Sequence, residues 1–581
     1  MKLIKWIEKP LHEMVFFIVC LICIIPPTMN HFLLLFKNVD IDILVMQYLS
    51  IAITISYVMT TIVYLFRKYR LVKCLAYVSV VTLLFVFLFL KLSFGTNVSP
   101  LVVLMLAETN TNESLEFLHN FALTKECFIS FAITIIMILA IVVMEKHTLK
   151  QKGNAIRHIV AALFIITLPV SIYATRIAKV LYDCRNMNEV NAWYDDYYPY
   201  AMDNISTLLY SIYIPHITAN EIASVVHRTT ESVKQQAETT EKDSLDVVFV
   251  IGESYIKYHA HLYGYDLPTT PIMDREQEKG NLYVFNNIIS PYNSTTLVVK
   301  NVMCTNSISD GEVWSDGIYF PAIFKRAGFN VYMWDNQKTL GSFLIYTFTI
   351  NSLIYNKQLA EVAYSETNNT TYKYDGELLQ SLFKEKTGKH NLSIIHLMGQ
   401  HVDASERYPQ TFNRFSGKDI KRKHAYLDEE KKQSIAEYDN ATLYNDSVIG
   451  MLFNTYRNKN AVVVYLSDHG EEIYDIRDAK GRNLEHVKDA DVIRYQNDVP
   501  FVVWCSDRYK ALHPDIINDL ETSINRKGML DNVCQLLFRL ANMKTSFYKP
   551  ERDITSQKYK TKKRIIYDEI DYDDIIENAG D

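Results

Sequence analysis

The sequence predicts an α/β fold class in two parts: an N-terminal five-helix transmembrane domain, followed by an α/β domain whose sheet is covered by helices on both faces. Charged side chains are scarce before about residue 180 and dense after about residue 225. Five long apolar stretches lie in the first part, and short runs rich in β-branched residues alternate with helical segments in the second. At 581 residues the chain exceeds what one hydrophobic core usually serves.

Each apolar stretch approaches the roughly 20 residues that a helix needs to cross a bilayer. A cleaved signal peptide explains the first stretch poorly, because further spans follow it. We therefore expect residues 1–180 to form a transmembrane domain. The five stretches run from about Met14 to Phe36, Ile43 to Phe66, Leu71 to Leu90, Cys127 to Met144 and Ile159 to Ala174.

Basic residues predict the orientation of these spans. They gather before the first span, between the second and third, and between the fourth and fifth. By the positive-inside rule the N-terminus is cytoplasmic, and the chain beyond about residue 180 lies outside. The residues are Lys2, Lys5 and Lys9, then Arg67, Lys68, Arg70 and Lys73, then Lys146, Lys150, Lys152 and Arg157.

The outward loop between the third and fourth spans changes from apolar to acidic and amide-rich in LVVLMLAETNTNESLEFL. One interpretation is an interfacial helix. The other is a binding site at headgroup depth for a zwitterionic lipid, because an ammonium group pairs well with carboxylates. The candidate residues are Glu108, Thr109, Asn110 and Glu113.

After the spans, residues 181–244 read as a linker with amphipathic helices, and residues 245–581 as the second domain. Buried strands that alternate with helices favour a parallel sheet with both faces covered. The β-branched runs lie at residues 246–252, 330–334, 392–399, 461–470 and 499–504.

Charge and cysteine content narrow the partners and the compartment. A net charge of -6 provides no basic field for nucleic acid, so we expect no nucleic-acid partner. Four of the eight cysteines lie in apolar stretches. The other four could form two disulfides in an oxidising compartment, with a connectivity that the sequence does not define: Cys184, Cys304, Cys505 and Cys534.

Polar residues follow three of the predicted strands at the edge where α/β sheets bind ligands. The first strand is followed by Glu253 and Ser254, the third by Gln400 and His401, and the fourth by residues 467–471, SDHGE. Each residue alone is ordinarily a capping or hydrogen-bonding group. Together, carboxylates and histidines from separate strands suit a zinc site with an open position for substrate.

The segments VVFVIGES, HLMGQH, YDNATLYNDSVI and YLSDHGEE occur in this order. In these motifs the chain resembles the sulfatase-like phosphoethanolamine transferases of Gram-negative bacteria, in the alkaline phosphatase superfamily. The resemblance implies an α/β/α sandwich domain in the periplasm, anchored in the inner membrane. It also implies phosphatidylethanolamine as donor and lipid A or lipopolysaccharide core as acceptor. The CxPxR motif of soluble sulfatases is absent.

The resemblance further implies Zn²⁺ bound by Glu253, Asp468, His469 and a nucleophilic threonine, which forms a covalent phosphoethanolamine intermediate. Thr296 in SPYNSTTLVVKNVMC matches the family position, and Thr295 is the adjacent alternative. The helix-compatible run that follows would place the hydroxyl at a helix N-terminus, which favours phosphate.

Further family positions carry substrate contacts. His401 and His486 match histidines that contact the phosphoryl group or the leaving oxygen. In WDNQK, Asn336, Gln337 and Lys338 fall where the family has polar substrate contacts. Cysteines that flank the nucleophile in lipid A enzymes are replaced here by Tyr292 and Val302, with Cys304 close by.

Two other functions remain open. A phosphoglycerol transferase would share the superfamily, the anchor and the threonine nucleophile. A catalytically silent membrane protein could keep the fold as a binding module, although retention of the predicted ligand set argues against it. The acceptor has no readable motif, so lipid A phosphate, a core sugar, another glycan and a surface protein all stay possible.

Overall fold

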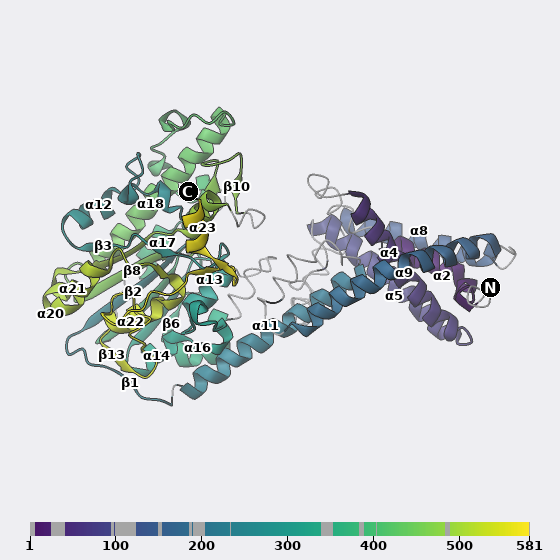
Figure 1. The fold of residues 1–581 in the computed structure, drawn as a ribbon, viewed down its shortest axis with the longest axis horizontal. Coiled ribbons are helices and arrows are strands. Elements are labelled where there is room, and N and C mark those ends of the chain that lie inside the picture. Colours follow the sequence, from purple (N-terminus) through teal and green to yellow (C-terminus); the bar gives the residue numbers. More distant parts are fainter. Residues whose placement is uncertain are drawn as a thin grey trace. The chain divides into compact units, whose positions relative to one another are not determined.

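The computed structural model describes most of the chain, which divides into two compact units, Met1–Asn220 and Glu221–Asp581 (Figure 1). The second unit begins inside the segment predicted as a linker, within helix α11 (Asn204–Ser232). The described residues are 6–24, 41–94, 98, 124–148, 154–184, 189, 204–232, 234–337, 353–382, 388–401, 404–482 and 489–579.

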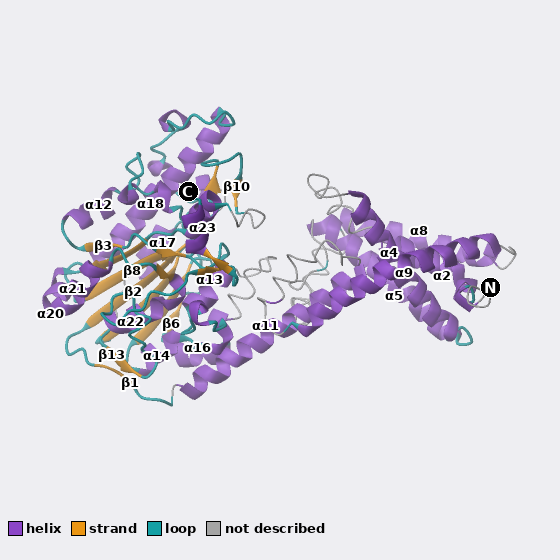
Figure 2. Ribbon diagram, viewed as in Figure 1, coloured by secondary structure: helices purple, strands orange, loops and turns teal. Residues whose placement is uncertain are grey.

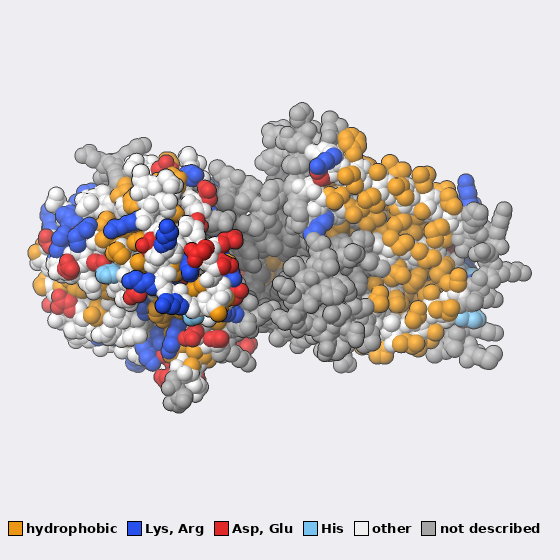
Figure 3. Space-filling view, turned by 90° about the horizontal axis from the view of Figure 1, so that it is seen from above, with side chains coloured by type: hydrophobic (Ala, Val, Ile, Leu, Met, Phe, Trp, Pro, Cys, Tyr) orange, Lys and Arg blue, Asp and Glu red, His pale blue; other side chains and the backbone are white. Residues whose placement is uncertain are grey.

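The first unit is helical, and hydrophobic side chains make up most of its described surface on the face seen in Figure 3. Among the described residues, Arg70–Ser93 and Lys125–Lys146 are long and apolar enough to cross a membrane. Three shorter apolar helices, Pro10–Cys23, Leu49–Leu65 and Ile156–Ile172, coincide with the other predicted spans. The helices are α2 (Met14–Ile24), α4 (Ile41–Leu65), α5 (Arg70–Phe94), α8 (Lys125–Thr148) and α9 (Asn154–Asp183).

Ion pairs join the helix ends that carry the basic residues. Lys73, near the start of α5, lies 2.6 Å from Glu13 before α2 and 3.0 Å from Glu145 near the end of α8. His158, near the start of α9, pairs with Glu8 at 2.5 Å. These ends therefore lie at one end of the bundle, as a common membrane face requires.

The second unit is built on a seven-stranded sheet in the order β3-β11-β8-β2-β7-β5-β6 (Figure 2). Strands β8, β2, β7, β5 and β6 are parallel, as predicted. The sheet is nevertheless mixed, because β11 runs antiparallel to β8 and β3. The strands are β3 (Leu282–Val284), β11 (Phe501–Cys505), β8 (Ala461–Ser467), β2 (Leu245–Gly252), β7 (His390–His396), β5 (Asn330–Asp335) and β6 (Glu366–Thr367).

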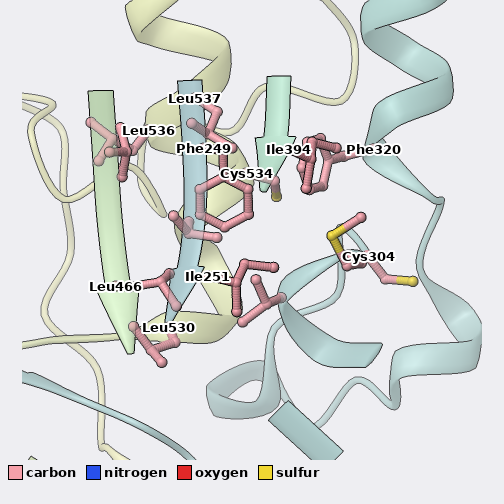
Figure 4. Close-up of a cluster of buried hydrophobic side chains, with 14 of the residues drawn as sticks. Phe249, Ile251, Cys304, Phe320, Ile394, Leu466, Leu530, Cys534, Leu536 and Leu537 are labelled. Atoms are coloured by element: carbon pink, nitrogen blue, oxygen red, sulfur yellow. The ribbon is translucent and has the colours of Figure 1, made fainter. Parts of the chain in front are cut away.

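Alternation along β2 divides the core between the two faces of the sheet. Phe249 and Ile251 point to the cluster formed with α13 (Thr295–Val302), α14 (Phe320–Arg326) and α22 (Val533–Leu540), part of which is drawn in Figure 4. Val248 and Val250 point to the opposite cluster, with α12 (Pro271–Glu278), α17 (Asp375–Leu382) and α18 (Glu429–Tyr456). Each buried side chain contributes roughly 1.5–3 kcal/mol of hydrophobic stabilisation. The prediction of two covered faces is confirmed.

Smaller elements complete the unit. The remaining helices are α16 (Lys357–Ala363), α19 (Ala490–Asn497), α20 (Asp507–Leu512), α21 (Pro514–Ser523) and α23 (Tyr572–Asn578). Four two-stranded ribbons pair β1 (Ala237–Thr239) with β13 (Met543–Thr545), β4 (Ile288–Ile289) with β12 (Gly528–Met529), β9 (Glu472–Ile473) with β10 (Lys480–Gly481), and β14 (Ile565–Ile566) with β15 (Ile570–Asp571).

The possible disulfides among the later cysteines do not form in the structure. Cys304, Cys505 and Cys534 all lie within the described residues and are buried thiols. Figure 4 shows Cys304 and Cys534 in the hydrophobic core. This unit is therefore held together by packing and hydrogen bonds.

Candidate metal centre

The carboxyl ends of the adjacent parallel strands β2 and β8 deliver three side chains to one place. Glu253 follows β2, and Asp468 and His469 follow β8. The Asp468 amide donates to the Gly252 carbonyl at 3.1 Å, which extends the strand pairing by one step. Ser254 then adopts a left-handed conformation (φ 54°) and donates its amide to Asp468 Oδ1.

Glu253, Asp468 and His469 form a compact, fully buried donor cluster. One ligand atom of each lies within 4.8 Å of the others. His469 Nε2 is 3.3 Å from Glu253 Oε1 and 3.2 Å from Asp468 Oδ2. None of the three side chains is exposed to solvent. The predicted convergence of these residues is confirmed.

The hydrogen bond of His469 Nδ1 fixes which ring nitrogen is available as a ligand. Nδ1 lies 2.8 Å from the Gly470 carbonyl oxygen, which can only accept a hydrogen bond, so Nδ1 carries the proton. Nε2 is therefore the nitrogen with the lone pair, and it faces the two carboxylates. Burial, reinforced by the charge of Arg482, lowers the pKa of His469, so the neutral ring is favoured. A neutral histidine oriented by a backbone carbonyl is the usual form of a metal ligand.

The carboxyl groups of Glu253 and Asp468 differ in their pKa values. Burial raises the pKa of Asp468 well above its ordinary range, and the Glu253 charge adds to the rise. Burial also opposes ionisation of Glu253, but the charges of His401 and Arg482 favour it, as would His469 in its protonated form, and the pKa of Glu253 lies well below its ordinary range. By itself, the cluster thus favours one ionised and one protonated carboxyl. A bound cation would ionise both.

The donor set fits zinc. Asp468 Oδ2 is buried and has no hydrogen-bond donor among the described residues. Two carboxylate oxygens and one imidazole nitrogen are ligands that zinc accepts, and a hydroxyl can complete four-coordination. An unsatisfied buried carboxylate oxygen is costly unless a cation or donor meets it. The cluster is therefore a candidate metal centre.

A threonine hydroxyl meets this cluster. Thr295 Oγ1 lies 3.0 Å from Glu253 Oε2 and 3.2 Å from His469 Nε2. Thr295 is the first residue of α13, after the N-cap Ser294. The structure thus brings Thr295 to the cluster, where the sequence interpretation preferred the neighbouring Thr296, a buried residue. Successive helical residues point about 100° apart, so the two hydroxyls face different surroundings.

The sulfatase family model matches residues 246–535, a range that includes the whole cluster. These residues form a sulfatase-family domain. The chain is 26% identical to the phosphoethanolamine transferase EptC of Escherichia coli strain K12, over 84% of each chain. It is 29% identical to the Kdo(2)-lipid A phosphoethanolamine 7''-transferase of Salmonella typhimurium, over 46% of each.

A solved full-length structure shares the fold. The integral membrane lipooligosaccharide phosphoethanolamine transferase A of Neisseria meningitidis has a TM-score of 0.53 and 16% identity, covering 93% of this chain and 97% of that one. The fold of this chain is therefore found in a known integral membrane protein.

In the sulfatase domain, Gln337 supports the cluster from the end of β5. Its Nε2 donates to Glu253 Oε2 at 3.0 Å and to the Leu397 carbonyl at 2.7 Å. The neighbouring Asn336 is buried, and its amide binds Asp375 and the Tyr372 backbone. In these contacts the side-chain amides of Gln337 and Asn336 form hydrogen bonds with other groups of the protein.

The other predicted site residues are placed in part. His401 follows β7 and is half-buried, and its charge favours ionised Glu253. His486, Lys338, Glu108, Thr109, Asn110 and Glu113 lie outside the described residues.

The sequence interpretation missed Arg482 of the sulfatase domain. Its Nη1 lies 2.6 Å from His469 Nε2 and 2.9 Å from the Asn293 carbonyl. The sequence feature that could have indicated this residue is the Gly-Arg pair in RDAKGRN. In the structure, Gly481 has a φ of 100° and lies at the end of the β9–β10 hairpin. This pair turns the chain back toward the metal centre.

Proposed function

We propose that this protein transfers phosphoethanolamine from phosphatidylethanolamine to lipid A or a related lipopolysaccharide acceptor, through a covalent intermediate on Thr295 at a zinc site. The observation that carries the proposal is the Thr295 hydroxyl within the Glu253, Asp468 and His469 cluster. The names of the similar curated proteins support the transferred group, and one of those names supports the lipid A acceptor.

Zinc would be held by Glu253, Asp468, His469 and Thr295. When bound, it would lower the pKa of the threonine hydroxyl and offset the charge of phosphoryl oxygens. The residues of the chain supply the rest. Glu253 Oε2 accepts a hydrogen bond from Thr295 Oγ1 and orients the hydroxyl, and Gln337 holds that carboxylate in place.

The reaction has two displacements at phosphorus. In the first, Thr295 Oγ1 loses its proton and bonds to phosphorus, while the bond to the diacylglycerol oxygen breaks and that oxygen takes up a proton. In the second, an acceptor oxygen bonds to the same phosphorus and gives up its proton, while the bond to Thr295 Oγ1 breaks and that oxygen takes up a proton. His401, whose charge acts on Glu253, is the proposed proton donor to the leaving oxygen, and His486 is proposed to assist it.

We also propose the predicted membrane arrangement of five spans, with a cytoplasmic N-terminus and the sulfatase domain on the periplasmic side of the bacterial inner membrane. The ion pairs of Lys73 and His158 support it, because they gather at one end the helix ends that the positive-inside rule assigns to the cytoplasm. Glu108, Thr109, Asn110 and Glu113 would then lie on the outer side, where the donor headgroup is found.

The decisive experiment uses the zinc-loaded full chain in detergent with headgroup-labelled phosphatidylethanolamine and purified lipopolysaccharide. We expect labelled phosphoethanolamine on the lipid A part, detected by mass spectrometry. Asp468→Ala and His469→Ala should lose both zinc and transfer, because an incomplete ligand set binds metal poorly. Transfer of glycerol phosphate from phosphatidylglycerol in place of phosphoethanolamine would contradict the proposed donor.

A further inference from the structure

Arg482 brings a positive charge to the edge of the metal centre from a separate structural element. In the β9–β10 hairpin, Lys480 pairs with Ile473 and Gly481 with Glu472. The next residue, Arg482, therefore lies across from Glu471, two residues after His469. Arg482 is exposed, while the cluster that its guanidinium contacts is fully buried. The guanidinium thus stands between the cluster and the solvent.

The hairpin that carries Arg482 is firmly attached. Glu472 accepts two hydrogen bonds from Arg477, at 2.6 and 2.7 Å, and one from Gln496 at 2.7 Å. Gln496 in turn accepts from Asn293 at 2.7 Å, and the Asn293 carbonyl accepts from Arg482. The guanidinium is therefore fixed relative to the loop that leads into Thr295.

The contact between Arg482 and His469 uses the atom that zinc needs. Arg482 Nη1 donates to the lone pair of His469 Nε2, and a metal ion bound to that nitrogen removes the acceptor. The guanidinium keeps its hydrogen bond to the Asn293 carbonyl, and the N–H that faced His469 becomes available to another acceptor at the same place. A phosphoryl group that approaches Thr295 carries non-bridging oxygens, and the planar guanidinium fork suits phosphate better than any other side chain does.

We propose that Arg482 binds a non-bridging phosphoryl oxygen of the donor phosphate. When the metal is bound, this oxygen replaces His469 Nε2 as the hydrogen-bond acceptor of the guanidinium. The inference rests on the proposed function and adds a substrate-binding residue to it.

The test measures zinc content and phosphate binding, with no need for turnover. The zinc-loaded full chain in detergent is titrated with inorganic phosphate by calorimetry, and its zinc is counted by metal analysis. For Arg482→Gln we expect unchanged or tighter zinc binding, because a competing donor is gone, and phosphate binding about 10- to 100-fold weaker. Arg482→Lys keeps the charge without the fork and should fall between. Lys480→Gln, which removes a neighbouring positive charge, is the matched control and should bind phosphate like the wild type.

The possible results distinguish a wrong role for Arg482 from a wrong proposed function. Loss of zinc from a folded Arg482→Gln chain would mean that Arg482 is only a brace for the hairpin, and would overturn the inference. Wild-type phosphate affinity in that variant would overturn it as well. If Arg482→Gln does not fold, the Lys variant decides, since wild-type affinity there would refute a role for the fork. A wild-type chain that binds zinc but forms no threonine adduct with phosphatidylethanolamine would count against the proposed function instead.

Discussion

At the scale of single residues, the two adjacent threonines decide where the covalent intermediate forms. Thr295→Ala should abolish the phosphoethanolamine adduct, because it removes the hydroxyl that contacts Glu253 and His469. Thr296→Ala, the matched control, should keep an adduct on Thr295. Peptide mass spectrometry after incubation with phosphatidylethanolamine locates the added group. An adduct on Thr296 in the wild-type chain would reverse the assignment.

The sequence could not settle this choice. Glu253, Asp468 and His469 were predictable because they directly follow strands whose ends must meet at one edge of a sheet. Thr295 and Thr296 depend on the residue at which α13 begins, and a shift of one residue turns the side chain by about 100°. Gln337 was predicted as a substrate contact. Its hydrogen bond to Glu253 joins two separate strand ends, and sequence alone does not show that contact.

Asp531 gives a stability prediction that depends on pH. Its Oδ2 accepts the Ile308 amide at 2.8 Å, and burial raises its pKa to about 6 from 3.8. Between these values the unfolded chain releases a proton that the folded chain retains, so stability falls as pH rises through this window. Relative to Asp531→Asn, the wild type should lose about 2 kcal/mol between pH 4 and pH 7.

The measurement is denaturant unfolding of the full chain in detergent, followed by tryptophan fluorescence at several pH values. The Asn variant cancels the contribution of every other titrating group, so only the difference between the two chains matters. A difference that does not vary with pH would show that Asp531 has an ordinary pKa.

At the scale of elements, the β9–β10 hairpin determines where Arg482 lies. Gly481 has a φ of 100° and open space around its Cβ position, so Gly481→Ala strains the backbone without a clash. The cost of a left-handed non-glycine residue is about 1–2 kcal/mol. We expect the hairpin to relax and phosphate affinity to fall while zinc content is kept.

Gly264→Ala is the matched control for this change. Gly264 has a φ of 97° and equally open surroundings, and it ends a short turn rather than the hairpin. Its replacement should lower the unfolding temperature similarly and leave phosphate binding unchanged. Equal loss of phosphate affinity in both variants would mean that general destabilisation, not the position of Arg482, is responsible.

The sequence predicted long elements better than short ones. The five long runs of β-branched residues all became strands, because each buries both faces. The direction of β11 was not predictable from its own residues. The chain leaves β8 and enters β11 at the same edge of the sheet, with α19 between the two strands, so β11 must run in the opposite direction to β8. At this edge the Ser467 amide donates to the Pro500 carbonyl.

The motif YDNATLYNDSVI in α18 shows that a recognisable segment need not touch substrate. Asp446 accepts the amides of Ile272 and Met273 at the start of α12, and Asn440 accepts those of Arg414 and Phe415. These contacts hold loops and helices around the sheet. This motif is therefore typical of the family because it holds the fold together.

At the scale of the whole molecule, the proposed topology predicts on which side of the membrane each segment lies. A reporter that is active only outside the cytoplasm should be active when fused after Tyr200 and silent when fused after Tyr69, between the second and third spans. Activity at both positions, or at neither, would contradict the count of five. This arrangement is a prediction from sequence alone, because hydropathy and the placement of basic residues act locally, without reference to tertiary contacts.

The buried thiols have a consequence for folding in the proposed periplasmic location. The second unit has three cysteines, Cys304, Cys505 and Cys534, and burial raises the pKa of each thiol, which keeps them protonated and unreactive. Thiol–disulfide exchange requires an accessible thiolate. A cell that lacked its disulfide-forming enzymes would thus still produce this domain in its native state, and reductants would have no cross-link to cleave.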